Sequence, residues 1–244
     1  MKKVLGLMIA FMVLASSVFA ISVDEIIGKM KDNQNKIKDM YAETVTIMDM
    51  SGFPKPKKGK APEMKMEQKG KLWVKGEDKS RVELDSPVKQ IMVTNGEKLI
   101  MINPKTGEKL SQDLKQAKKQ NPINFQGGNF GLSKLKEQYN MSVREKGNEL
   151  AIICEPKNKK EVGVSIEIYI DKDKWLAKEI SVKTNEGLMV SNTDIEYQNV
   201  SGAWVPKKMN SMANAIFGKM KIKMLFNNIK VNQGIDDKVF KIDD

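Results

Sequence analysis

The chain has 244 residues, of which 40% are hydrophobic, and it carries a formal net charge of +11 with no histidine and one cysteine, Cys154. A single cysteine excludes an intramolecular disulfide, and the lack of histidine excludes Ser-His-Asp hydrolysis, a cysteine–histidine nucleophile and histidine-based zinc sites. The lysines are dispersed among the strands and no nucleic-acid-binding module accompanies them, so we expect no nucleic-acid partner.

Residues 1–20 have the pattern of a secretory signal peptide. Two lysines precede an apolar run from Val4 to Leu14, and small residues follow up to Ala20. The apolar run is shorter than a membrane-spanning helix requires. We therefore expect a cleavable signal peptide and a mature protein that lies outside the cytoplasm. No long linker or internal repeat divides the rest, so we expect residues 21–244 to form a single domain.

The mature chain begins with a pattern typical of an amphipathic helix, SVDEIIGKMKDNQNKIKDMY, from Ser22 to Tyr41. Ser22 followed by Glu25 is a capping box, and apolar residues recur at helical spacing as far as Met40. A helix with one apolar stripe buries that stripe against another element. We expect it to cover a sheet.

From Ala42 onward the hydrophobic period changes to two, which predicts β-strands. Short turns rich in Asn, Gly and Asp separate the strands, as in an antiparallel meander. The segment from Ser51 to Pro62 is rich in lysine and proline and predicts an exposed loop. A second break, from Gln112 to Gln138, carries weak helical patterns over Asp113 to Lys119 and Leu132 to Gln138.

One hairpin is predicted with particular clarity, in KQIMVTNGEKLIMINPKTGEKL. Asn95-Gly96 predicts a two-residue turn, which would place Met92 opposite Leu99. Both faces of this hairpin are apolar, whereas a half-solvated sheet alternates apolar and polar residues. The second face must therefore have cover of its own, and the pattern leaves open which face points inward.

Methionine is abundant, with 17 residues in the chain, and many of them fall on predicted strands. Methionine adapts to ligands of variable shape, although core packing, or a high methionine content in the proteins of the source organism, explains the same pattern. The pairs Met48-x-Met50 and Met64-x-Met66 also offer thioethers suited to Cu(I). Strand alternation alone accounts for both pairs, so we predict no metal site. The carboxylates cluster in turns beside lysines, and we predict no catalytic residues and no cofactor.

The segment from Gly70 to Leu114 resembles the central block of the periplasmic lipoprotein carrier family, LolA and its outer-membrane lipoprotein-sorting relatives. The shared pattern is Gly-x-Leu-Trp, a strand ending before Pro, an Asn-Gly hairpin and a strand leading to Asn-Pro. Here these positions are Gly70, Leu72, Trp73, Pro87, Asn95, Gly96, Asn103 and Pro104. The leading helix and the final NIKVNQGIDDKVFKID are similar to the two ends of the family's fold.

The resemblance implies a mainly β protein with a few helices: an incomplete antiparallel β-barrel covered by the leading amphipathic helix and a mid-chain helical lid. It also implies an apolar cavity for lipoprotein acyl chains or other lipids, no enzymatic activity, and an inner-membrane ABC transporter and an outer-membrane acceptor as partners. We further expect the exported protein to be a periplasmic monomer that makes transient contact with the membrane surface. The candidates for the cavity lining are Ile26, Ile27, Met30, Trp73, Ile91, Val93, Ile100, Ile102, Met220, Ile222, Met224 and Phe226.

Two departures from the family pattern bear on function. In the best-studied branch an arginine that latches the lid follows the Leu-Trp-Val-Lys strand, but this chain has Gly76 there; Arg81 is the candidate substitute. The Ser51 to Pro62 loop is also longer than a minimal carrier needs. The alternative function is a periplasmic lipid or envelope-stress sensor that regulates an inner-membrane partner, although such sensors usually carry an additional C-terminal domain.

Overall fold

The computed structural model describes residues 21–54, 65–114, 132–160, 163–215 and 218–241. The predicted signal peptide, most of the lysine- and proline-rich loop and the first predicted mid-chain helix beyond Leu114 lie outside these ranges. Within them, no helix has the length and apolar character needed to span a bilayer.

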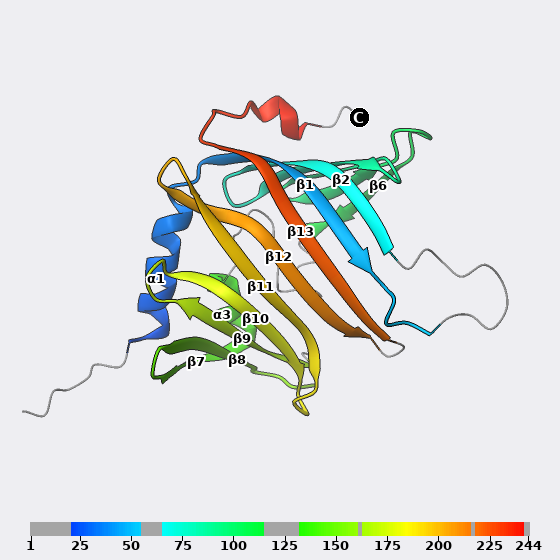
Figure 1. The fold of residues 1–244 in the computed structure, drawn as a ribbon. Helices are drawn as coiled ribbons and strands as arrows, with labels where there is room; N and C mark the ends of the chain where they lie inside the picture. Colours follow the sequence, from blue (N-terminus) through cyan, green and yellow to red (C-terminus); the bar gives the residue numbers. More distant parts are fainter. Residues whose placement is uncertain (1–20, 55–64, 115–131, 161–162, 216–217, 242–244) are drawn as a thin grey trace, which may run out of the picture.

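Thirteen strands form one antiparallel sheet (Figure 1). Their order is β6-β5-β4-β3-β2-β1-β13-β12-β11-β10-β9-β8-β7, so two meanders meet where β1 pairs with β13. Because β6 and β7 end the order without pairing with each other, the sheet is open, which confirms the predicted incomplete antiparallel barrel. The strands are β1 Asp39–Asp49, β2 Lys65–Lys75, β3 Lys79–Ser86, β4 Gln90–Asn95, β5 Lys98–Ile102, β6 Lys109–Asp113, β7 Tyr139–Lys146, β8 Glu149–Pro156, β9 Val164–Asp171, β10 Leu176–Thr184, β11 Met189–Val200, β12 Ala203–Ala215 and β13 Gly218–Val231.

The leading helix, α1, spans Val23–Gln34 and is shorter than predicted. Its start follows the capping box, because the Ser22 hydroxyl accepts a hydrogen bond from the Glu25 backbone N–H at 3.1 Å. Its end is set by tertiary contacts: the Asn33 side chain donates to the Trp204 carbonyl at 3.0 Å and accepts from the Trp204 N–H at 3.1 Å. The expected helix to Tyr41 is therefore wrong, since Met40 already pairs within the sheet on β1.

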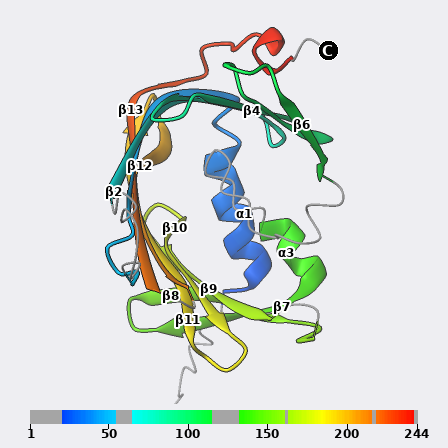
Figure 2. The same ribbon diagram turned by 90° about the vertical axis from the view of Figure 1, so that its right-hand side faces the viewer.

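The sheet curls around two helices (Figure 2). One is α1 and the other is α3, Leu132–Gln138, which coincides with the second predicted mid-chain helix. An ion pair between Lys136 and Asp24 joins them. A short 3₁₀ helix, η2, Asp237–Phe240, lies on the outer side of the curl against β3 and β4.

The Asn95-Gly96 hairpin has a longer turn than the sequence predicts. Met92 pairs with Met101 rather than Leu99, and Thr94 pairs with Leu99. The Asn95 side chain causes the difference, because its Oδ1 accepts hydrogen bonds from the backbone N–H groups of Glu97, at 3.2 Å, and Lys98, at 3.0 Å. This Asx-type turn consumes two more residues than a two-residue hairpin would. A shift of two residues leaves each side chain on its predicted face.

Two apolar clusters fill the inside of the curl. The larger one packs α1 and α3 against strands β7 to β11, with Ile26, Leu135 and Ile152 among its most buried members. The smaller one lies near the end of α1 and contains Met40, Val74, Ala203, Val205 and Val231. The face of the sheet that carries both clusters is hereafter the concave face, and the opposite side is the convex face.

Candidate functional site: a methionine strip on the concave face

The concave face can be followed across the junction of the two meanders by register. Residues directly opposite one another in neighbouring strands share a face. Ile195 of the larger cluster pairs with Met209, Met209 with Met224, and Met224 with Thr46. The concave face therefore continues from the helix-covered strands into β12, β13, β1 and β2. From Leu72 of β2 the register runs through Val82 to Met92, so the same face continues into β3, β4 and β5.

Seven methionines lie on this continuation, and we call them the methionine strip. Three cross-strand pairs are part of it: Met48 with Met66, Met92 with Met101, and Met209 with Met224. Every member is half-buried, unlike the fully buried Ile26 or Ile152 of the larger cluster. The strip consists of Met48, Met66, Met92, Met101, Met209, Met220 and Met224.

The strip carries no charge, because side chains alternate between the two faces along each strand and the lysines of β13 lie on the convex face. Met220, Ile222 and Met224 of β13 point to the concave face, whereas the lysines between them pair with convex-face residues such as Ile47 and Met212. The uncharged Thr46 and Gln68 lie between the methionines on the concave face. An apolar, adaptable and uncharged surface of this kind suits hydrocarbon chains better than polar ligands.

The structure divides the predicted lining residues into two groups. Ile26, Ile27 and Met30 of α1 belong to the larger cluster and pack against the sheet. On β13, Met220, Ile222 and Met224 are half-buried on the concave face, and Phe226 is buried there. These seven residues therefore lie on the same side of the sheet.

The other five predicted lining residues lie on the convex face, so their expected place in one cavity with α1 has to be corrected. Trp73 contacts Tyr41, with ring centroids 5.3 Å apart. From Trp73 the register runs through Arg81 to Val93 and then Ile100. The pair Ile91 and Ile102 follows on the same face. The reason is physical: period-two alternation separates two faces but does not tell which of them curls inward.

Arg81 also lies on the convex face. Its Nε donates to Glu83 Oε1 at 2.7 Å and its Nη1 donates to the Val239 carbonyl at 3.2 Å. In the described part of the chain Arg81 thus holds the C-terminal segment, not a lid over the concave face. Gly76 has φ +63°, a conformation that favours glycine, and its N–H donates to the Lys38 carbonyl at 3.0 Å.

Five strip residues were absent from the sequence-based candidates: Met48, Met66, Met92, Met101 and Met209. Each was visible as a methionine on a predicted strand. The missing information was the register that brings strands far apart in sequence together, above all the pairing of β1 with β13.

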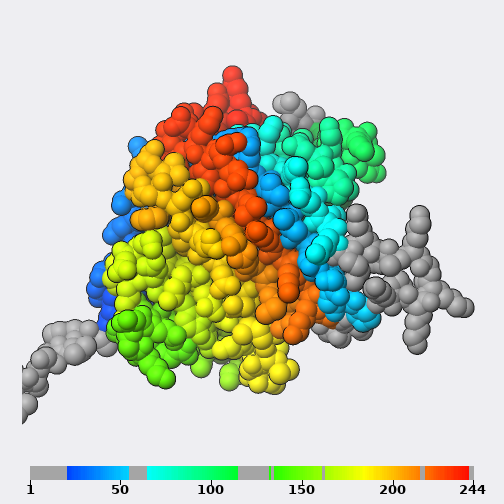
Figure 3. Space-filling model, in the orientation of Figure 1, coloured from blue at the N-terminus to red at the C-terminus, as the bar shows by residue number. Residues whose placement is uncertain are grey.

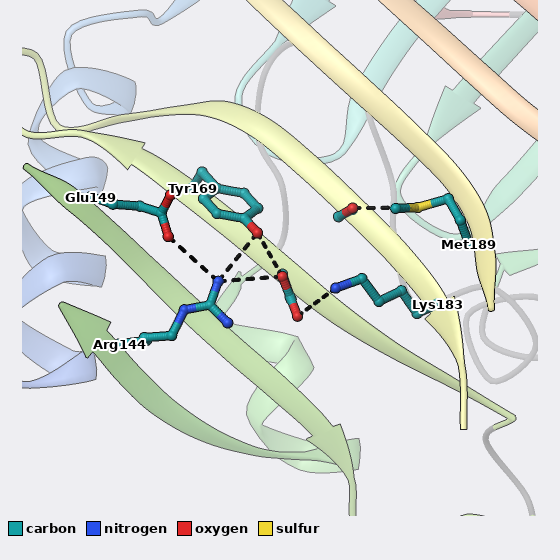
Figure 4. A network of polar contacts seen from close by, with 7 residues as sticks. Arg144, Glu149, Tyr169, Lys183 and Met189 are labelled. Carbon is teal, nitrogen blue, oxygen red and sulfur yellow. Dashed lines mark hydrogen bonds and ion pairs between the residues drawn. The ribbon is translucent and has the colours of Figure 1, made fainter. Parts of the chain in front are cut away.

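Over strands β7 to β10 the convex face carries a polar network (Figure 4). Arg144 Nη2 lies 3.6 Å from Glu149 Oε1 and 3.2 Å from the Tyr169 hydroxyl oxygen. Glu167 accepts hydrogen bonds from the Tyr169 hydroxyl at 2.7 Å and from Lys183 Nζ at 2.8 Å. These groups satisfy one another, which is the arrangement of a structural surface network.

Burial suppresses the ionisation of two side chains in the larger apolar cluster, Cys154 and Tyr139. Burial raises the pKa of the Cys154 thiol to about 12 and also raises the pKa of Tyr139. A thiol in this environment stays protonated and inert. Within the described ranges, no three His, Cys, Asp or Glu side chains gather closely enough to hold a metal ion.

Comparison with known proteins agrees with this architecture. A family model described as "Outer membrane lipoprotein carrier protein LolA" matches residues 57–209, more than half of the chain. Outer-membrane lipoprotein carrier proteins of Pseudomonas aeruginosa and Pseudomonas paraeruginosa are 30% identical over 93 residues, or 38% of this chain. The matched region spans 44% of the length of those relatives.

Solved structures share the fold at low sequence identity. A LolA superfamily protein from Nitrosomonas europaea has a TM-score of 0.59 at 11% identity, covering 91% of this chain and 99% of that one. A putative outer membrane lipoprotein-sorting protein domain from Vibrio parahaemolyticus has a TM-score of 0.64 at 12% identity, covering 89% and 95%. From its curled open sheet and its match to the family model, the chain belongs to the LolA family of outer membrane lipoprotein carrier proteins.

Proposed function

We propose that this protein is a periplasmic carrier that shields the acyl chains of lipoproteins, or other lipids, on its concave face during transfer from the inner to the outer membrane. The observation that carries the proposal is the methionine strip: seven half-buried apolar side chains on the concave face, next to a closed core. Family membership supports the same class of cargo.

The proposed carrier binds its cargo by noncovalent contacts alone. Each buried CH₂ group contributes about 0.8 kcal/mol of transfer free energy, so an acyl anchor cannot remain exposed in an aqueous compartment. Methionine suits a surface that must accept and release chains of different shape, because its unbranched side chain changes conformation easily. The proposed partners are an inner-membrane ABC transporter that supplies cargo and an outer-membrane acceptor that receives it, with the carrier acting as a monomer.

The direct test is to purify the mature protein, extract it for bound lipid and titrate it with a fluorescent acyl probe. We expect Met66→Glu to weaken probe binding by at least about tenfold, because it places a charge on the strip, whereas Met66→Leu retains binding. Met212→Glu is the matched control, since Met212 lies on the convex face and is 39% exposed.

Thermal unfolding of each variant separates loss of binding from loss of folding. A wild-type protein that yields no lipid and binds no acyl probe would overturn the proposal, as would equal binding by Met66→Glu and Met212→Glu. Capture of a membrane-bound signalling protein, with no transporter recovered, would favour the sensor alternative.

A further inference from the structure

We infer that one end of the sheet is a docking surface for anionic membranes. Two hairpins meet there: the β10–β11 hairpin, and the end of β12 with the start of β13, which lie at the lower end of the molecule (Figure 1). The surface, which we call the basic-apolar rim, consists of Leu188, Met189, Met212, Lys219, Lys221 and Lys223. The purpose of this surface rests on the proposed carrier function, but its existence is tested independently.

The apolar part of the rim is unusually exposed. Leu188 is 69% exposed, Met212 39% and Met189 37%. Of the large exposed apolar side chains in the described ranges, these three lie at this end and the remaining two, Val88 and Leu110, lie elsewhere. Exposed apolar groups that gather in one place mark surfaces that bind proteins or membranes.

Hydrogen bonds hold the rim in this exposed conformation. The Thr184 N–H donates to the Leu188 carbonyl at 2.8 Å, and the Leu188 N–H donates to the Thr184 hydroxyl oxygen at 3.3 Å. Ser181 Oγ donates to the Met189 sulfur at 3.4 Å, and Asn214 Nδ2 donates to the Met189 carbonyl at 2.9 Å. The last bond joins the two hairpins, whose surfaces lie next to each other at the lower end of Figure 3.

Charge identifies the partner as an anionic surface. Lys219, Lys221 and Lys223 are exposed on the convex face of β13, and Lys221 is directly opposite Met212. The whole chain has a net charge of +11, of which Lys2 and Lys3 of the predicted signal peptide contribute two. Lysines beside exposed apolar side chains bind anionic bilayers, because the charges attract lipid phosphates while the apolar groups enter the interface.

The position of the rim next to the methionine strip gives a geometric reason for a membrane to dock there. Met220 lies two residues after Gly218, where β13 begins at the hairpin. Met48 and Met66, on the ends of β1 and β2, reach the same end of the sheet, since Asp49 pairs with Lys221. A membrane bound at the rim would therefore adjoin one end of the strip, so an acyl chain would cross little water on its way to the concave face.

The experiment is vesicle flotation with the mature protein. We expect binding to vesicles of phosphatidylethanolamine and phosphatidylglycerol, weaker binding to phosphatidylcholine vesicles, and a decrease with added salt. Lys221→Glu/Lys223→Glu and Leu188→Ser are each expected to weaken binding by about tenfold. Lys89→Glu/Lys98→Glu and Val88→Ser are the matched controls, because these residues are exposed and far from the rim in the sheet order.

A site-specific label adds a direct readout of insertion. The only native cysteine, Cys154, is fully buried, so an environment-sensitive fluorophore attached to Leu188→Cys reports the rim alone. We expect its emission to shift to the blue on anionic vesicles, while the same label on Val88→Cys does not shift. Absence of vesicle binding by the wild type, or rim variants that bind as the controls do, would overturn the inference.

Vesicle binding and acyl-probe binding by the same variants test this inference and the proposed carrier function independently. Rim variants are expected to bind the soluble acyl probe as the wild type does, because their side chains lie outside the methionine strip. Probe binding without vesicle binding would overturn the rim and leave the carrier standing. Rim-dependent vesicle binding without any lipid or probe on the concave face would overturn the carrier and leave the rim.

Discussion

Cys154 shows how burial controls the chemistry of a single residue. It is fully buried in the larger apolar cluster, and this burial raises the pKa of its thiol to about 12. Because the thiolate is the reactive form, we expect native protein at pH 8 to react with a thiol reagent only after unfolding. The reagent releases a chromophore when it reacts with a thiol, so its absorbance in buffer and in denaturant measures the reaction of Cys154. Rapid labelling of the folded protein would contradict it.

Glu167 links the convex polar network to acid stability. Its side chain is 14% exposed. Burial by itself would raise its pKa, but hydrogen bonds from Lys183 and Tyr169 and the charge of Arg144 together hold the pKa below the ordinary value of 4.5. A carboxyl whose pKa is lowered by folding stabilises the protein above its unfolded pKa, and this contribution is lost as the pH falls through the folded pKa.

We therefore expect Glu167→Gln to lower the free energy of unfolding by about 1 kcal/mol at pH 7, with the difference from wild type shrinking below pH 4.5. Denaturant unfolding at a series of pH values provides the measurement. Glu137→Gln, at an exposed position on α3, serves as the control. A difference that stayed constant down to acid pH would show that the ionised network contributes nothing.

At the scale of elements, the C-terminal segment fastens the convex face. Asp237 Oδ1 lies 2.8 Å from Lys75 Nζ and 3.3 Å from Lys79 Nζ, and Lys75 also donates to the Ile235 carbonyl at 2.8 Å. Phe240 of η2 is 5% exposed. Val93 of β4, a strand that η2 contacts, is 2% exposed. This segment helps to explain why the hairpin can be apolar on both faces.

Phe240→Ala tests whether packing on the convex face and lipid binding on the concave face are independent. We expect it to lower the free energy of unfolding by about 3 kcal/mol, because it leaves a cavity under η2, while binding of the acyl probe to the concave face remains unchanged. Chemical denaturation and probe titration measure the two effects. Lys238→Ala, at an exposed position of η2, is the control. Loss of probe binding with no loss of stability would contradict the assignment of faces.

Prediction from sequence succeeded where information is local. The capping box at Ser22, α3 and the strand alternation of β13 follow from short patterns, and the structure contains all three. It failed where distant residues decide the outcome. Trp204 lies 171 residues from the Asn33 side chain that it binds at the end of α1. The choice of concave face also depends on how the whole sheet curls, which no short pattern encodes.

At the scale of the whole molecule, long-range contacts tie the two meanders together. The register is continuous from β2 through β1 and β13 to β12. Lys29 Nζ of α1 lies 4.0 Å from the centroid of the Trp175 ring, between β9 and β10, while the end of the same helix binds the backbone of Trp204 on β12. The helix therefore contacts the second meander both at its middle and at its C-terminal end.

We expect residues 21–244 to unfold in one cooperative transition, because exposing either apolar cluster would uncover the strands that support the other. Trp73 on β2 and Trp175 before β10 report the two meanders separately when each is kept as the only tryptophan by Trp→Phe substitution of the others. Their fluorescence midpoints in denaturant should coincide with each other and with the loss of β-sheet circular dichroism. An earlier midpoint for Trp73 would show that β1 to β6 can open alone, and would divide the proposed single domain at the pairing of β1 with β13.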